Sequence, residues 1–278
     1  MSYQLPVTSF QKKALFVFSL LAAGCWLLAA PINAQNELAD YQFQYEQYRK
    51  LYPEFTRARD SFLQHGTLAS QQEAIGSTKQ LILQRAQVMR AHLLLLRRRL
   101  RGAPDIVTEA RTELSTILDQ EAEWLDYHIR DIEAVSTPTL GNLFELSDRF
   151  ERRQELWRAL SYETVARILL GKTRQVQNEA VTINGLLEEH ILQQDPQEQA
   201  LFKNWLDETK NGAYQSQQYI EQAELILIEL IQDRGDASGT IGAFSELQTS
   251  LENSRQLLLR AVSFQKEIID RFEVNNGG

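Results

Sequence analysis

The side chains that could build a metal site are sparse in this 278-residue sequence, which holds four histidines and one cysteine. Carboxylate-bridged di-iron bundles need a glutamate three residues before a histidine, so that both project from one helix face. The residues at that position are Phe62, Met89, Leu125 and Leu187. No two histidines have the four-residue spacing of a helical zinc site. The sequence therefore predicts no metal centre.

The patterns of nucleophilic and phosphate-binding sites are also missing. Gly171-Lys172-Thr173 resembles the end of a phosphate-binding loop, but Ala166 stands where that loop requires its first glycine. No serine lies in a nucleophile elbow, and Cys25 is the only thiol. We therefore predict no catalytic residue and no cofactor, and we expect a protein that is not an enzyme.

One local concentration of charge follows four consecutive leucines: Arg97, Arg98, Arg99 and Arg101. Cations in the last turn of a helix interact favourably with the negative end of its dipole and with its free carbonyls. Alternatively, these arginines could contact an anionic membrane or a wall polymer, which makes them the candidate site for an anion or a partner. Acidic residues close in sequence, such as Asp105 and Glu109, could neutralise the cluster.

The arginines end the clearest helix of the sequence, which we predict to span 70–102. Ser70 and Glu73 have the spacing of a capping box, and Gly102 and Pro104 mark the end of the helix. Between these ends Lys79 alone interrupts an apolar seam with alternating steps of four and three residues: Ile75, Ile82, Ala86, Met89, Leu93, Leu96 and Leu100. Such a seam must be buried by partner helices.

The following segments repeat this pattern, and we predict helices over about 105–135, 139–194, 196–234 and 240–272. Asp195 and Pro196 have the residue types of a helix start. The seam of 139–194 changes phase between Leu160 and Tyr162, as expected where a helix changes partners. With a composition that favours helices over strands, the sequence predicts an all-α fold, an elongated antiparallel bundle of five to six long helices with coiled-coil-like seams. Within 35–278, two overlapping sub-bundles would share the long helix 139–194.

An aromatic stripe opens this helical part, at the same helical spacing: Tyr41, Tyr45, Tyr48, Tyr52 and Phe55. Pro53 predicts a kink or an interruption of the helix there. The rings could form core against the 70–102 helix, or they could form an exposed stacking platform for sugars or a partner. We predict core positions for at least Tyr45 and Tyr48.

Residues 1–34 have the pattern of a signal peptide, with Lys12 and Lys13 before an apolar run and a possible cleavage site at Ala34. An uncleaved membrane anchor and a lipoprotein modified at Cys25 are the alternatives. Cleavage would remove two lysines and no acid, which leaves 27 basic residues against 37 acidic ones and a net charge of about −10. An acidic exported chain is not expected to bind nucleic acid.

The stretches YQFQYEQYRKLYPEF and LASQQEAIGSTKQLILQRAQVMRAHLLLL together resemble uncharacterised, exported all-helical proteins predicted from genomes of uncultivated bacteria. The resemblance covers about the first third of the chain after residue 34. It implies export and a helical fold, and it implies no activity.

These features predict an exported, non-enzymatic protein of the cell envelope that acts as a scaffold or binds a macromolecule. Its partner would be another envelope protein or a polymer, and contact with a membrane is compatible with the arginine cluster. The alternative is a small-ligand-binding or sensor bundle, with a pocket where small residues such as Ala213 and Ser216 loosen the packing. Long seams can be buried within one chain or between chains, so the oligomeric state stays open.

Overall fold

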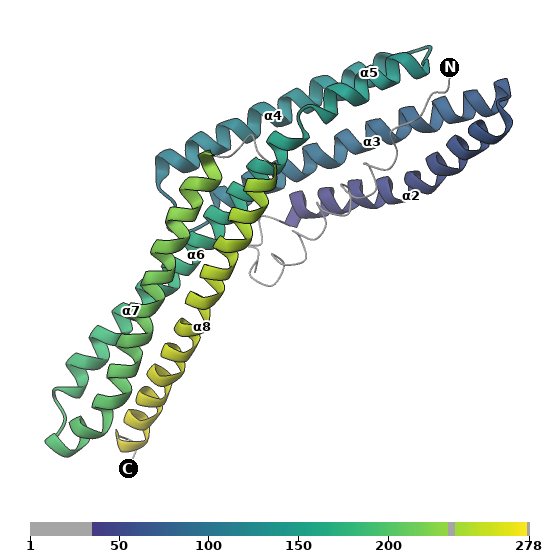
Figure 1. Ribbon diagram of the computed structural model, residues 1–278. Helices are drawn as coiled ribbons and strands as arrows, with labels where there is room; N and C mark the ends of the chain where they lie inside the picture. The colour runs from purple at the N-terminus through teal and green to yellow at the C-terminus, as the bar shows by residue number, and fades with distance from the viewer. Residues whose placement is uncertain (1–34, 233–236, 277–278) are drawn as a thin grey trace. The chain divides into compact units, whose positions relative to one another are not determined.

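The computed structural model describes residues 35–232 and 237–276, and these residues are helical almost throughout (Figure 1). The helices are α2 (Gln35–His65), α3 (Leu68–Arg101), α4 (Thr108–Ala134), α5 (Leu140–Glu151), α6 (Gln154–Ile191), α7 (Pro196–Gln232) and α8 (Ala237–Asn276). No strand occurs in the described part of the chain. The all-α prediction is confirmed, with six long helices and the 12-residue α5. The predicted signal peptide, with its alternatives, lies outside the described residues.

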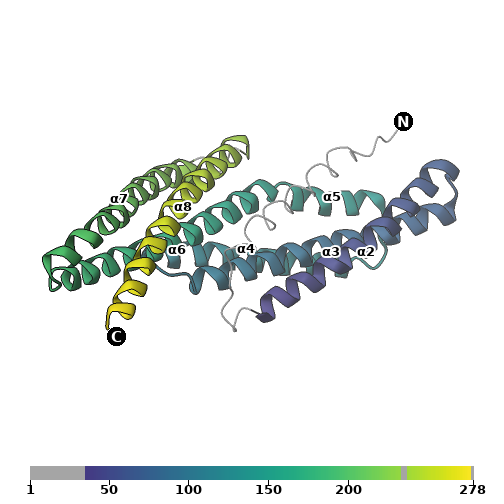
Figure 2. The ribbon, with the colours of Figure 1, turned by 90° about the horizontal axis from the view of Figure 1, so that it is seen from below.

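The chain divides into two compact units. Among the described residues, unit 1 comprises 35–102 and Thr112–Ser161, and unit 2 comprises Ala103–Arg111, 162–232 and 237–276. Within unit 1, α2 and α3 lie antiparallel and side by side, and within unit 2 α7 and α8 do the same (Figures 1 and 2). Short connections impose this antiparallel order.

The segment 139–194, predicted as one helix, forms two helices that meet at Arg152 and Arg153. The backbone tightens there, because the Arg153 N–H donates to Phe150 O, three residues back, over 3.1 Å. The Arg153 side chain leaves the helix surface and bonds the carboxylate of Glu121 on α4 at 2.7 Å. No proline or glycine marks this break, so the sequence does not show it.

The start of α3 differs from the prediction, and its end agrees with it. Thr67, not Ser70, is the N-cap: its hydroxyl accepts the Ser70 N–H, and the Ser70 hydroxyl accepts the Thr67 N–H, both at 3.1 Å. This reciprocal pair is a capping box one turn before the predicted one. Gly66, at φ +57°, turns the chain into the helix. At the other end Gly102 is the C-cap, as predicted.

The predicted seam of α3 is largely buried, with Ile75 and Met89 half-buried. Lys79, which interrupts the seam, crosses to the C-terminal end of α4. Its ammonium group donates to Val135 O at 2.7 Å and to Glu133 O at 3.3 Å. Free carbonyls at a helix end are stabilised by such a cation. Lys79 therefore connects α3 to the C-terminal end of α4 by hydrogen bonds.

The aromatic stripe divides into a buried ring and half-buried ones. Tyr41 is buried, in a cluster with Ala91 and Leu95 of α3. The ring of Tyr45 stacks on that of Tyr41 at 6.3 Å, but Tyr45 and Tyr48 are only half-buried and do not take the fully buried core positions predicted for them. Tyr52 and Phe55 are half-buried as well. Burial raises the pKa of Tyr48 to about 12. The stripe is thus the edge of the α2–α3 contact rather than a fully exposed platform.

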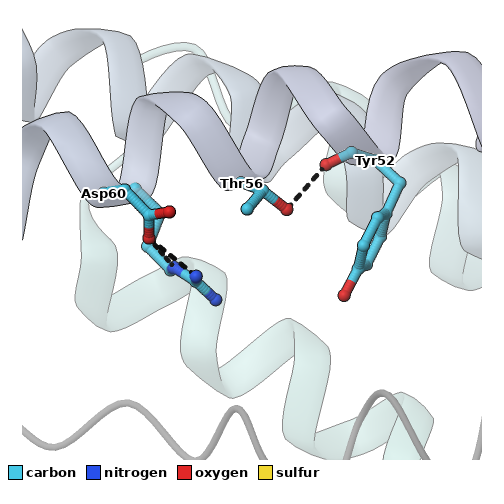
Figure 3. A network of polar contacts seen from close by, with 4 residues as sticks. Tyr52, Thr56 and Asp60 are labelled. Carbon is cyan, nitrogen blue, oxygen red and sulfur yellow. Dashed lines mark hydrogen bonds and ion pairs between the residues drawn. The ribbon is translucent and has the colours of Figure 1, made fainter.

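The sequence predicts a kink or an interruption at Pro53, and the interruption is wrong, because α2 continues through Pro53 to His65. Proline removes one backbone donor from a helix and crowds the preceding turn. The Thr56 hydroxyl donates to Tyr52 O at 3.0 Å, and Arg59 pairs with Asp60 (Figure 3).

In unit 2 the predicted seam of α7 is buried at every position: Phe202, Leu206, Thr209, Ala213, Ser216, Ile220, Ala223, Leu227 and Leu230. Polar side chains connect α7 to its neighbours inside this core. Asn184 Oδ1 accepts bonds from Thr209 Oγ1 at 2.6 Å and from Gln265 Nε2 at 2.9 Å. These bonds can form only in one register, so they favour a single alignment of α6, α7 and α8.

In unit 2, one helix end differs from its predicted position and one helix start agrees with it. Helix α8 continues to Asn276, four residues beyond the predicted end at about 272. Helix α7 starts at Pro196 as predicted, with Asp195 Oδ1 accepting the N–H groups of Gln197 and Glu198 at 2.8 and 3.1 Å. Among residues 35–232 and 237–276, no helix combines the length and apolarity that crossing a bilayer requires.

Candidate functional site

A groove in unit 2 begins at the loop between α3 and α4, which is seated directly on α6. The contact is at Gly171, where a Cβ atom would overlap Pro104 O and would lie 3.2 Å from Ile106 Cγ1. Only glycine lets the loop backbone approach α6 this closely. Arg111 holds the same loop from α4, since its Nη2 donates to Ala103 O at 3.0 Å and to Ile106 O at 3.2 Å.

Asp105 lies at the tip of this loop with a φ of 49°. This left-handed conformation is uncommon for residues with a side chain, although aspartate adopts it more readily than most. The Asp105 side chain is exposed. The clamped loop therefore presents a carboxylate from a backbone that is fixed on both sides.

Beyond the loop, a groove with a volume of about 610 Å³ runs along the exposed face of α6. Seven residues line it: Pro104, Asp105, Gln175, Asn178, Glu179, Thr182 and Ile183. Inside the lining, Gln175 Nε2 donates to Glu179 Oε1 at 2.8 Å. The groove is open to solvent.

The lining combines acidic, polar and apolar side chains. It offers two carboxylates, two amides, one hydroxyl and two apolar side chains, and none of the seven residues is basic. No nucleophile stands beside a general base in this lining. Among residues 35–232 and 237–276, no group of three or more histidine, cysteine, aspartate or glutamate residues is placed to hold a metal ion.

Two histidines lie in the core of unit 1. His92 Nε2 lies 3.0 Å from Ser161 Oγ, and that hydroxyl donates its own hydrogen to Trp157 O at 2.7 Å. Both contacts are satisfied together when Nε2 carries the hydrogen and donates it to Ser161 Oγ. Burial lowers the pKa of His92 to about 4, and burial lowers that of His128 to about 4 as well. Both rings are therefore neutral at pH 7 and pack as core residues.

The arginine cluster lies at the C-terminal end of α3 in unit 1. Arg97 and Arg101 both pair with Asp119 of α4, Arg101 at 3.6 Å, and Arg98 lies 3.9 Å from Glu37 of α2. The Nε atom of Arg99 is buried. The acidic neighbours are thus Asp119 and Glu37 rather than the sequence-adjacent pair considered above. The hypothesis that this cluster contacts an anion or a partner stays a prediction.

Sequence reasoning missed a charged network that joins α4 to α6. Glu121 is buried and accepts a bond from Trp157 Nε1 at 2.8 Å, and Arg153 reaches both of its carboxylate oxygens at 2.7 Å. The Arg153 guanidinium also lies over the Trp124 ring, 4.6 Å from its centroid. The partners of Glu121 and Arg153 in this network all belong to unit 1, so we interpret it as stabilising that unit. Its only sequence signal is a glutamate beside the α4 seam.

The groove was also missed, since its polar residues have the composition of an ordinary solvated helix face. Its one signal is Gly171, a glycine in the middle of a helix. No protein-family model matches this chain, and no similar curated protein or solved structure is found.

Proposed function

We propose that this protein is a non-enzymatic helical binding module, exported to the cell envelope, which holds part of another macromolecule in the α6 groove. The observation that carries the proposal is the loop 103–107, clamped between Gly171 and Arg111 at the head of an open groove. A binding surface is most effective when its contact groups are already held in place before the partner arrives.

The open shape favours a macromolecular segment over a small ligand, because pockets for small molecules enclose most of the ligand surface. The exposed face of α6 also continues beyond the groove, where Leu186 is 62% exposed. A helix or an extended segment of a partner could follow this face in the manner of helix-in-groove recognition. The small-ligand alternative placed a pocket near Ala213 and Ser216, but these residues are buried and close-packed, with Ser216 bonded to Ser254 at 2.8 Å.

Site-specific photo-crosslinking in the producing cell tests the proposal on the full chain. A benzoylphenylalanine at Asn178 lies in the groove lining, and one at the exposed Gln218 of α7 is the matched control. We expect an adduct of defined mass from position 178, absent from position 218, whose yield falls when Thr182→Arg fills the groove. Equal adducts from both positions, or an adduct that Thr182→Arg leaves unchanged, would refute the groove as the binding site.

A further inference from the structure

We propose that the α6 groove selects a positively charged segment of a partner protein, with a lysine or arginine side chain placed against Asp105 and Glu179. This inference rests on the proposed function and adds the chemistry of the partner. Asp105 and Glu179 are the only charged residues among the seven that line the groove. They come from two different elements, the clamped loop and α6, so a cation in the groove can approach both.

The remaining lining fits the rest of such a side chain. Lysine and arginine bury their methylene stems on apolar surface and keep the charged end among polar groups. Pro104 and Ile183 supply that apolar surface, and the amides of Gln175 and Asn178 lie in the same groove. An acidic partner segment would meet two like charges here, and a purely apolar one would leave the two carboxylates and two amides without water.

The charge of the whole unit acts in the same direction. Acidic residues outnumber basic ones by almost two to one in unit 2, whereas the two kinds are nearly balanced in unit 1. Several of the basic side chains of unit 2 are already paired within it, including Arg174 with Glu224 and Lys210 with Glu188. Such an excess of negative charge attracts cationic partners and accelerates their association.

The direct test uses two synthetic peptides and the protein from Gln35 onward, without the predicted signal peptide. One peptide is acetyl-ALKALKA-amide, and the other has glutamine in place of both lysines. Nuclear magnetic resonance titration at low salt should show shifts of the backbone amide signals of Asn178 and Thr182 with the lysine peptide. Exposed ion pairs are weak, so we expect the lysine peptide to bind only about tenfold more tightly than the glutamine peptide.

A pair of double variants separates the groove from the overall charge. Asp105→Asn with Glu179→Gln should abolish the preference for lysine, whereas Glu221→Gln with Glu229→Gln, two exposed acids of α7, should preserve it. Both double variants lose the same two charges. Equal loss in both, or equal binding of the two peptides to the unmodified chain, would overturn the inference, and so would free spermidine that binds the groove as tightly as the lysine peptide.

The crosslinking experiment keeps this inference distinct from the proposed function. If the Asn178 adduct forms and Asp105→Asn with Glu179→Gln leaves its yield unchanged, the binding function stands and the selection of a cationic segment is wrong. If the adduct forms and the double variant abolishes it, both stand. If position 178 gives no adduct while the lysine peptide binds as expected, the peptide chemistry is right and the proposed macromolecular partner is wrong.

Discussion

The seating of the loop 103–107 on α6 can be tested by one added methyl group. Gly171→Ala places a Cβ atom into Pro104 O, with Ile106 Cγ1 at 3.2 Å and Asp105 O at 3.4 Å. Gly185→Ala makes the same change in the same helix, at a position where nothing lies within 4 Å of the added Cβ atom. The two variants differ only in what the methyl group meets.

The two substitutions should change stability in opposite directions. Alanine is favoured over glycine in a helix by about 1 kcal/mol, so Gly185→Ala should raise the free energy of unfolding by about 0.5–1 kcal/mol. At Gly171 the same gain is opposed by overpacking, which typically costs 1–3 kcal/mol. The clashing atom belongs to the backbone, and Arg111 holds the loop against moving away. We therefore expect Gly171→Ala to lower the free energy of unfolding by about 1–2 kcal/mol.

Urea unfolding followed by circular dichroism at 222 nm measures both variants. Their difference, about 1.5–3 kcal/mol, is above the error of such measurements when the slope of the transition is unchanged. If Gly171→Ala stabilised the protein as much as Gly185→Ala, the loop would not be seated on α6, and the head of the groove would be wrongly placed.

Three further predictions concern unit 1. Tyr41→Ala should lower the free energy of unfolding by about 3 kcal/mol, whereas Phe43→Ala, at a ring that is 59% exposed, should change it by less than about 0.5 kcal/mol in the same urea experiment. Lys79→Met should cost about 1 kcal/mol and increase amide hydrogen exchange at the end of α4, where its ammonium group binds Val135 O. Because the pKa of His92 falls from about 6.5 in the unfolded chain to about 4 in the fold, the unfolded state binds the proton first on acidification. The contribution of His92 to stability should be constant above pH 6.5 and fall by up to about 3 kcal/mol between pH 6.5 and 4. Because the pKa of His128 is lowered in the same way, His92→Gln should remove only part of the acid-side decline in urea titrations.

Those parts of the fold that depend on one helix and its immediate ends could be predicted from the sequence. The buried seam of α7 follows from helical periodicity alone, and its start at Pro196 follows from Asp195, whose carboxylate caps the first turn. Both signals are local, so no knowledge of the neighbouring helices is needed to read them.

The start of α3 shows where local signals compete. Thr67 and Ser70 have capping-box spacing, and so do Ser70 and Glu73. The choice depends on where the preceding chain turns, and Gly66 makes that turn with a positive φ. With Thr67 as the N-cap, the N–H and the hydroxyl of Ser70 both bond to Thr67. With Ser70 as the N-cap, these two bonds would be replaced by bonds to Glu73. A pattern search that scores each motif alone cannot rank the two.

The partners of the arginine cluster could not be predicted, since proximity in sequence is a poor guide across antiparallel helices. Asp119 is 22 residues from Arg97, and Glu37 is farther still, yet both lie on helices that pack beside the end of α3. Asp105, only four residues from Arg101, instead lies in unit 2 at the head of the groove. The loop changes units within a few residues, which no composition or periodicity signal reveals.

The groove has its position because the surroundings of α6 change along its length. The predicted phase change between Leu160 and Tyr162 coincides with the boundary between the two units, and from Trp157 to Arg174 every residue of α6 is buried or half-buried. The loop 103–107 covers α6 at Gly171, and the first exposed residue after it is Gln175. Beyond it α6 is covered on the side of Gln177, whose amide donates to Ala213 O of α7 at 2.7 Å. The opposite face is left to solvent directly beside the loop. The groove lies at this point because α6 continues beyond Gly171, whereas the loop 103–107 covers it only up to there.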